Sequence, residues 1–290
     1  MTHQPFGVTA EQVAFFQREG YLVLPDFASA EEVAALLARA DELLRAFEPS
    51  ANPSVFSTTK QTETSDEYFL RSANNVSFFL EPGALDAHGQ LRVPRHLAVN
   101  KIGHALHDLD PVLGPWSRSA KVAALLRALG LARPLPMQSM YLCKPPVHGG
   151  VVVPHQDSCF LDTEPDSCHG LWVALEDAGR ENGCLWAVPR SHEGGVRGRF
   201  VLDEHRKTEW SGGVPPEYPP FGEDSQSGWV PLEAKAGTAV LLHGATVHAS
   251  AANTSLASRH AYSVHYVDAE ATWQPTNWLQ RDEDFPAVAL

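Results

Sequence analysis

The chain carries a histidine and an aspartate two residues apart in the segment Pro154-His155-Gln156-Asp157, at the end of a β-type run. Residues i and i+2 of a strand project from the same face, so His155 and Asp157 can direct an imidazole and a carboxylate to one point. Two such ligands and a distant second histidine form the facial triad of non-haem Fe(II) sites, which leaves positions open for a cosubstrate and dioxygen. The His-x-Asp pattern alone is weak, because it occurs by chance in many proteins.

Two downstream histidines, His243 and His248, are candidates for the third ligand, since they follow a strand-like apolar run. The next such run, residues 260–267, is preceded by Arg259, and alternation places Arg259 and His265 on one face of it. An arginine that points into a barrel is costly unless it meets an anion. Its planar guanidinium matches a carboxylate in bidentate fashion, as the distal carboxylate of 2-oxoglutarate requires.

The elements that must position these residues differ between the two parts of the chain. Residues 1–134 are predicted to be mostly helical, and capping boxes mark two helix starts, at Thr9 and at Ser29. Further elements expected in this part are a strand at residues 21–24, a polar surface connection at residues 49–75, and helices at residues 99–109 and 119–129.

From residue 135 onward, short runs rich in Val, Leu, Trp and Tyr are separated by Gly, Pro and Asn. The expected strands are residues 137–143, 150–154, 170–175, 184–188, 238–242 and 260–267. Such spacing predicts a sandwich or jelly roll. Glu181-Asn182-Gly183 predicts a two-residue hairpin turn, and the proline-rich residues 211–228 predict a long loop that forms a lid or a disordered insert. We therefore expect one domain over residues 1–290, mainly β with flanking helices and a jelly-roll core at 135–290.

Composition limits the partners of this protein. The 290 residues include 22 Lys+Arg against 35 Asp+Glu, and the net charge of −13 argues against nucleic acid as a partner. No apolar run approaches the roughly 18 residues of a membrane helix, and the N-terminus lacks a signal-peptide pattern. We expect a soluble, intracellular, cytoplasmic protein that binds a small molecule and no membrane. The four cysteines lack metal-knuckle spacing and are expected to be reduced.

Eight segments carry recognisable motifs, in this order: FQREGYLVL (16–24), NKIGHALH (100–107), QSMY (138–141), PHQD (154–157), LWVALED (171–177), ENGCLW (181–186), HGATVH (243–248) and SRHAY (258–262). Together they resemble the phytanoyl-CoA dioxygenase family of Fe(II)/2-oxoglutarate oxygenases over nearly the whole chain. The resemblance implies a double-stranded β-helix, the cupin-like jelly roll, with flanking helices. It also implies Fe(II) held by His155, Asp157 and His248, and 2-oxoglutarate as cosubstrate.

In that family an arginine eleven residues after the distal histidine binds the cosubstrate, and this spacing from His248 leads to Arg259. The same spacing leaves His243 as a structural residue. One local departure is Pro189-Arg190-Ser191-His192, where the family usually has glycine at the second position. Without glycine, this turn must keep φ below zero or carry strain. Five further histidines are expected to support the site or the fold, namely His104, His107, His192, His260 and His265.

By the same resemblance, Lys101, Met140 and Trp172 line the 2-oxoglutarate pocket. Lys101 can add a second cation for the cosubstrate dianion, and Trp172 an apolar wall that keeps water out. Each of the three also fits an ordinary role, Lys101 as a lysine that reaches the surface and the other two as core residues.

The implied enzyme couples oxidative decarboxylation of 2-oxoglutarate to succinate and CO₂ with hydroxylation of a small-molecule substrate, using dioxygen and with ascorbate as a supporting reductant. No Rossmann, Walker or nucleophile-elbow motif occurs. The alternatives therefore share the scaffold: a metal-dependent lyase or isomerase, or a metal-binding jelly roll without turnover. The prime substrate stays open, because phytanoyl-CoA is suggested by the family name alone and a CoA thioester favours a more basic entrance than this chain offers.

Overall fold

Two antiparallel sheets form the framework of the computed structural model, which describes residues 7–49, 54–213, 215–221, 228–282 and 289–290. The seven-stranded sheet runs β1 (Tyr21–Leu24), β12 (Ala239–His243), β7 (His169–Ala174), β14 (Ala261–Asp268), β4 (Pro134–Leu142), β3 (Val99–His104), β2 (Val76–Leu80). The four-stranded sheet runs β11 (Val230–Leu232), β8 (Leu185–Ala187), β13 (His248–Ser250), β5 (Val152–His155). Two small pairs join β9 (Phe200–Leu202) to β10 (Thr208–Trp210) and β6 (Thr163–Glu164) to β15 (Thr272–Trp273).

The two large sheets pack face to face through apolar side chains. Trp172 and Val240 of the seven-stranded sheet share one buried cluster with Leu185, Leu232 and Ala249 of the four-stranded sheet. This arrangement is the double-stranded β-helix that the sequence predicts.

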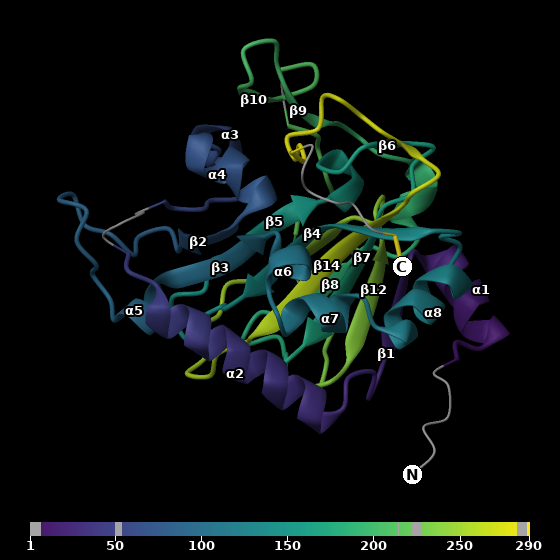
Figure 1. Cartoon of the computed structure of the whole chain (residues 1–290), viewed down its shortest axis with the longest axis horizontal. Helices are drawn as coiled ribbons and strands as arrows, with labels where there is room; N and C mark the ends of the chain where they lie inside the picture. The colour runs from purple at the N-terminus through teal and green to yellow at the C-terminus, as the bar shows by residue number, and fades with distance from the viewer. Residues whose placement is uncertain (1–6, 50–53, 214, 222–227, 283–288) are drawn as a thin grey trace.

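Helices cover the outer face of the seven-stranded sheet (Figure 1). The two predicted capping boxes are confirmed: Thr9 begins α1 (Ala10–Glu19) and Ser29 begins α2 (Ala30–Ala46). The predicted helix at 119–129 is confirmed as α8 (Ala120–Ala128). The remaining helices are short: α3 (Gln61–Thr64), α4 (Glu67–Arg71), α5 (Arg95–Ala98), α6 (Leu106–Leu109), α7 (Leu113–Ser117), and the 3₁₀ turns η1 (Ser72–Asn74), η2 (Asp157–Cys159) and η3 (Ser191–Gly194).

The predicted helix at residues 99–109 is wrong over most of its length. Residues 99–104 form β3, which pairs with β2 on one side and β4 on the other, and only the short α6 follows. Five of the six residues of β3 are buried, so the segment shows no alternation that separates a strand from a helix. The first third of the chain therefore contributes three strands, β1, β2 and β3, to the main sheet.

The predicted hairpin at Glu181-Asn182-Gly183 is also wrong. The strands on either side of it, β7 and β8, belong to different sheets, so the segment carries the chain from one sheet to the other. Gly183 alone of the three residues has positive φ, at 81°, whereas a two-residue type I′ turn requires positive φ at both central positions.

Residues 49–75 are more than a surface connection. Among the described residues of this segment, Thr58 bonds to the backbone beside β5: its Oγ1 donates to the Val151 carbonyl at 3.1 Å and accepts from the Val153 amide at 3.4 Å. Phe56 and Gln61 line the central cavity. The polar side chains that suggested solvent exposure thus attach the segment to a sheet edge.

The departure from the family turn has a structural consequence at Arg190. This residue adopts φ 64° and ψ 3°, the left-handed conformation that glycine takes without cost.

The predicted loop at 211–228 contains no helix or strand in its described parts, 211–213, 215–221 and 228, and the rest lies outside the described residues. Among the helices that the structure describes, none has both the length and the apolar character needed to cross a bilayer. All four cysteines are buried and free of disulfides.

Candidate metal centre and its pocket

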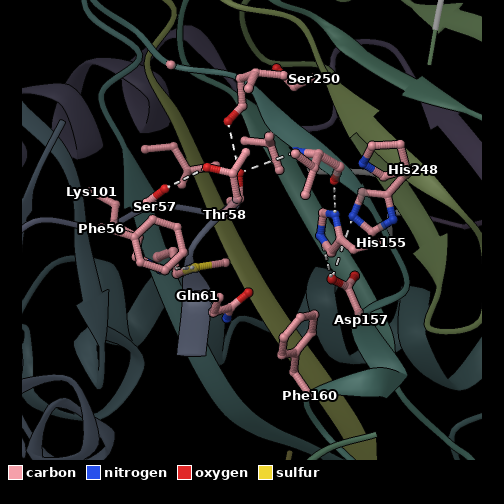
Figure 2. A pocket seen from close by; sticks show the side chains of 18 of the residues that line it. Phe56, Ser57, Thr58, Gln61, Lys101, His155, Asp157, Phe160, His248 and Ser250 are labelled. Carbon is pink, nitrogen blue, oxygen red and sulfur yellow. Dashed lines mark hydrogen bonds and ion pairs between the residues drawn. The ribbon is translucent and has the colours of Figure 1, made fainter. Parts of the chain in front are cut away.

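A cavity of about 840 Å³ opens between the two sheets. All seven site residues predicted from the sequence line it: Lys101, Met140, His155, Asp157, Trp172, His248 and Arg259. The alternation expected along residues 260–267 holds, because Ser263 and His265 of β14 also face this cavity. Figure 2 shows the histidines and Asp157 at one side of the pocket and Lys101 with Phe56 at the other.

Three potential ligands converge where β5 and β13 run side by side. His248 lies directly opposite His155 in the strand register, and their ring centroids are 4.1 Å apart. Asp157 lies just beyond the strand, at the start of η2, and its Oδ1 is 3.7 Å from His155 Nε2 and 3.6 Å from His248 Nε2. One donor atom from each of the three falls within 4.8 Å of the others. Two imidazoles and one carboxylate at this separation can hold a single metal ion.

Backbone carbonyls fix which ring nitrogen each histidine presents. His155 Nδ1 lies 2.9 Å from the Val153 carbonyl, and His248 Nδ1 lies 3.0 Å from the Thr246 carbonyl. A carbonyl only accepts, so each Nδ1 carries the proton and each Nε2 keeps its lone pair facing Asp157. Each strand thus orients its own ligand through the residue two positions earlier.

The electrostatic surroundings keep His155 and Asp157 in the states that a metal requires. Burial, together with the neighbouring His248, lowers the pKa of His155 to about 4. Burial by itself raises the pKa of Asp157, but His265 and His248 outweigh it and hold this pKa well below its usual range. His265 Nε2 lies 3.2 Å from Asp157 Oδ2, whereas the contacts of His155 and His248 are to Oδ1. Neutral imidazoles and an ionised carboxylate are the forms that bind cations.

Arg259 supplies an unpaired cation to the same cavity. Its side chain is 2% exposed, its Nε donates to the Gly183 carbonyl at 3.1 Å, and its Nη2 lies 3.5 Å from Ser250 Oγ. Nη1 has no hydrogen-bond partner among the described residues. The guanidinium lies 5.3 Å from the Trp172 ring centroid, and burial lowers its pKa to about 10. A buried guanidinium with a free N–H is arranged to receive an anion.

Lys101 is the second buried cation of the cavity wall. Its Nζ lies 3.3 Å from the centroid of the Phe56 ring and 3.7 Å from Met140 Sδ, and the residue is 4% exposed. Burial lowers the pKa of Lys101 to about 7. The ordinary role considered from the sequence, a lysine that reaches the surface, does not apply, because the side chain is buried and its amino group lies against the Phe56 and Phe79 rings.

Comparison with known proteins identifies the family to which this chain belongs. The sequence profile of the Phytanoyl-CoA dioxygenase (PhyH) family matches residues 16–261. The chain belongs to the phytanoyl-CoA dioxygenase family. It is 45% identical to the phytanoyl-CoA dioxygenase of Arabidopsis thaliana over 275 residues, 94% of each chain. It is 43% identical to phytanoyl-CoA dioxygenase domain-containing protein 1 of Bos taurus over 290 residues, 98% of each chain.

Solved structures with the same fold include one crystallised with 2-oxoglutarate and one of an α-ketoglutarate-dependent epimerase. EctD from S. alaskensis, crystallised with 2-oxoglutarate and 5-hydroxyectoine, superposes with a TM-score of 0.65 at 22% identity and covers 99% of this chain and 88% of its own. The non-heme α-ketoglutarate-dependent epimerase SnoN superposes with a TM-score of 0.62 at 20% identity, covering 97% and 91%. At this identity the likeness establishes the fold of this family member.

One residue of the site, Ser250, was not singled out from the sequence, and the contact made by another, His265, was not predicted. Ser250 stands two positions after His248 on β13, so the same alternation that was applied to His155 and Asp157 would have placed it in the cavity. His265 was assigned only a supporting role, and its contact with Asp157 needed the register of β14 against β7, which the sequence does not give.

The histidine set aside from the triad lies elsewhere. His243 stacks with His169 and His192, at ring-centroid distances of 5.5 and 5.1 Å, and with Phe16 of α1. Its Nδ1 accepts from the Ala245 amide at 3.1 Å, and burial lowers its pKa to about 3. His243 therefore packs an aromatic cluster against α1 and is absent from the cavity wall.

Proposed function

We propose that this family member is an Fe(II)- and 2-oxoglutarate-dependent dioxygenase that hydroxylates a small-molecule substrate, with the whole chain forming one catalytic domain. One observation carries the proposal: the cavity holds a two-histidine, one-carboxylate cluster and, in the same wall, a buried guanidinium with an unpaired N–H. The two features match the two cofactors, because the first binds a divalent transition metal and the second a carboxylate.

The donor set fits iron. His155 and His248 each present Nε2, and Asp157 presents Oδ1, so three protein ligands occupy one side and leave the cavity side open. When bound there, iron supplies the redox chemistry that couples oxidative decarboxylation of 2-oxoglutarate to oxidation of a C–H bond. The protein's own share is to orient the ligands, exclude water and keep Asp157 ionised through His265.

For the cosubstrate we propose that Arg259 receives the distal carboxylate of 2-oxoglutarate, with Ser250 Oγ beside it. Trp172 forms the apolar wall next to the guanidinium, and Lys101 with Met140 forms the wall on the side of β3 and β4. Two cations for one dianion give the pocket a charge that matches 2-oxoglutarate, and Lys101 gains a proton as the anion arrives.

The substrate is expected to enter where aromatic residues line the cavity. Phe160 lies 6.1 Å from the His155 ring centroid and contacts Trp210, while Tyr218 bonds to Cys159 at 3.3 Å. No charged side chain of the described residues lines the cavity beyond Glu81, Lys101, Asp157, Arg259 and histidines. We infer that the part of the substrate that reaches the metal is uncharged and apolar or aromatic.

Succinate formation tests the proposal. Purified protein supplied with Fe(II), ascorbate, air and 2-oxoglutarate should release succinate even without a prime substrate, as measured by NMR. The matched controls are Asp157→Ala, which removes a charged ligand, and His243→Ala, which removes a histidine outside the cavity. Equal succinate from the wild type and Asp157→Ala would favour a metal-binding protein without turnover.

A further inference from the structure

A second buried lysine, Lys144, bonds to Ser250 of the cavity wall without lining the cavity itself. Lys144 is 5% exposed, and it shares this position with Ser250 and Glu81, each 1% exposed. Lysine and glutamate are almost never buried to this degree unless each is paired. The contacts of Lys144 therefore indicate what its burial achieves.

Lys144 bonds directly to the serine that contacts Arg259. Its Nζ donates to Ser250 Oγ at 2.9 Å and to the Gly150 carbonyl at 2.7 Å. The Ser250 hydroxyl in turn donates to the Gly183 carbonyl at 2.9 Å, which also accepts from Arg259 Nε at 3.1 Å. Because an ammonium is only a donor, it occupies a lone pair of Oγ and directs the hydroxyl proton to a carbonyl. The lysine, the serine and the guanidinium thus form one chain of hydrogen bonds.

Two glycines enclose the lysine stem and hold it in this position. A Cβ atom added to Gly183 would lie 2.6 Å from Lys144 Cε, and one added to Gly149 would lie 3.0 Å from Lys144 Cγ. Side chains at either position would therefore displace the lysine. The backbone of Lys144 itself has φ 39°, in the left-handed region, so its ammonium reaches Ser250 from a conformation that costs energy.

Glu81 supplies the balancing charge. Its Oε2 accepts from the Gly150 amide at 3.1 Å, so the same peptide segment binds Glu81 through its amide and Lys144 through its carbonyl. Burial raises the pKa of Glu81, and a bond from Asn100 and the charges of Lys144 and Arg259 oppose that rise. Burial and the charge of Arg259 lower the pKa of Lys144, so two basic groups share one buried carboxylate, and a further negative charge in this part of the cavity would favour the protonated lysine.

We propose that Lys144 is a positioning residue for 2-oxoglutarate: it fixes the Ser250 hydroxyl, and through it the Arg259 guanidinium, so that the unpaired Nη1 faces the distal carboxylate of the cosubstrate. This inference rests on the proposed function. Lys144 does not line the cavity and touches no atom of the metal triad. Its influence is therefore confined to the end of the cosubstrate that Arg259 binds.

The test compares two ligands that differ only at that end. 2-Oxoglutarate has the distal carboxylate, whereas 2-oxovalerate has the same five carbons and lacks it. Binding of each to the Mn(II)-loaded protein is measured anaerobically by calorimetry. Lys144→Met should weaken 2-oxoglutarate about tenfold, as expected when a charged hydrogen-bond donor is lost, and leave 2-oxovalerate within twofold. Lys235→Met, which removes an exposed lysine bonded to Asp177, should change neither affinity.

A thermodynamic cycle tests whether the effect passes through Arg259. In the Arg259→Ala background, Lys144→Met should weaken 2-oxoglutarate by less than twofold, because the group that it positions is gone. A full tenfold loss in that background, or an equal loss for both ligands in the wild-type background, would overturn the inference. So would a Lys144→Met protein that binds 2-oxoglutarate normally.

Two further measurements keep the outcomes distinct. If Lys144→Met does not fold, Ser250→Ala is the alternative variant, because it removes only the hydroxyl between Lys144 and Arg259. It should give the same selective loss of 2-oxoglutarate affinity. An unchanged 2-oxoglutarate affinity in Ser250→Ala would refute the proposed link from Lys144 to Arg259. Failure of the proposed function has another signature, namely wild-type protein that does not prefer 2-oxoglutarate over 2-oxovalerate and forms no succinate.

Discussion

Replacing Arg259 by methionine should separate what this residue does for stability from what it does for binding. The side chain is buried without an anion, and burial lowers its pKa from 12.5 to about 10. At neutral pH this corresponds to a cost of about 3 kcal/mol for keeping the ligand-free guanidinium charged. Methionine retains much of the side-chain volume and removes that cost.

The opposing term is the loss of two hydrogen bonds, from Nε to the Gly183 carbonyl and from Nη2 to Ser250 Oγ. Each contributes about 1 kcal/mol, and Gly183 keeps its bond from Ser250. The free energy of unfolding of ligand-free Arg259→Met should therefore stay within about 2 kcal/mol of the wild type. Binding should respond differently, since losing one partner of a buried ion pair costs about 3 to 5 kcal/mol, which is roughly two to three and a half orders of magnitude in Kd.

Two measurements on the same samples decide the matter. Urea unfolding gives the stability of the ligand-free proteins, and calorimetry with the Mn(II)-loaded forms gives the Kd of 2-oxoglutarate. Arg45→Met is the matched control, because its guanidinium is exposed and pairs with Asp41 at the surface. Arg259→Lys should recover only part of the affinity, since an ammonium cannot make the two-pronged contact. A 2-oxoglutarate affinity within threefold of the wild type, or a loss of stability well above 2 kcal/mol, would contradict this account of Arg259.

Three other predictions follow from single residues. Asp157→Ala should lose Fe(II) binding measured by calorimetry under anaerobic conditions, whereas His243→Ala should retain it; equal affinities would remove Asp157 from the ligand set. Burial lowers the pKa of Lys101 from 10.5 to about 7, so the unfolded chain binds more protons between those values and stability should rise with pH across that window. Lys101→Met should flatten this rise in urea unfolding at pH 7, 8 and 9, and an unchanged slope would count against it. Arg190→Gly should stabilise the protein by up to about 1 kcal/mol in the same assay, because glycine adopts the backbone angle φ 64° of this turn without strain. A destabilised variant would show that Arg190 carries no strain at this turn.

The sequence predicts the metal-ligand residues of the site better than the cavity wall that contains Lys101. His155 and Asp157 are two residues apart, so the local backbone at the end of β5 brings them together, and the capping boxes at Thr9 and Ser29 are local in the same way. Contacts across the sheet are different. Lys101 reaches the cavity only because residues 99–104 form β3, a central strand that hydrophobic pattern could not separate from a helix.

The segment before β2 shows a second limit of pattern. Its polar residues predict solvent exposure, but a threonine hydroxyl such as that of Thr58 satisfies a sheet edge equally well. The pairing partner lies 93 residues away, and local composition contains no information about it. The walls that enclose the cavity on this side are thus fixed by tertiary contacts, whereas His155 and Asp157 are brought together by local backbone geometry.

The charges of the cavity explain why these two kinds of residue are found together. Asp157 is ionised among three histidines, while Arg259 and Lys101 lie in the wall without a carboxylate partner among the described residues. A bound metal ion alone would leave Arg259 and Lys101 without an anion. Bound 2-oxoglutarate alone would place its negative charge near the Asp157 carboxylate. Together the metal and 2-oxoglutarate place a positive charge beside Asp157 and a negative charge beside Arg259, so each makes the site more favourable for the other. A cavity that is electrostatically unfavourable when empty is therefore what we expect of a site built to bind both at once.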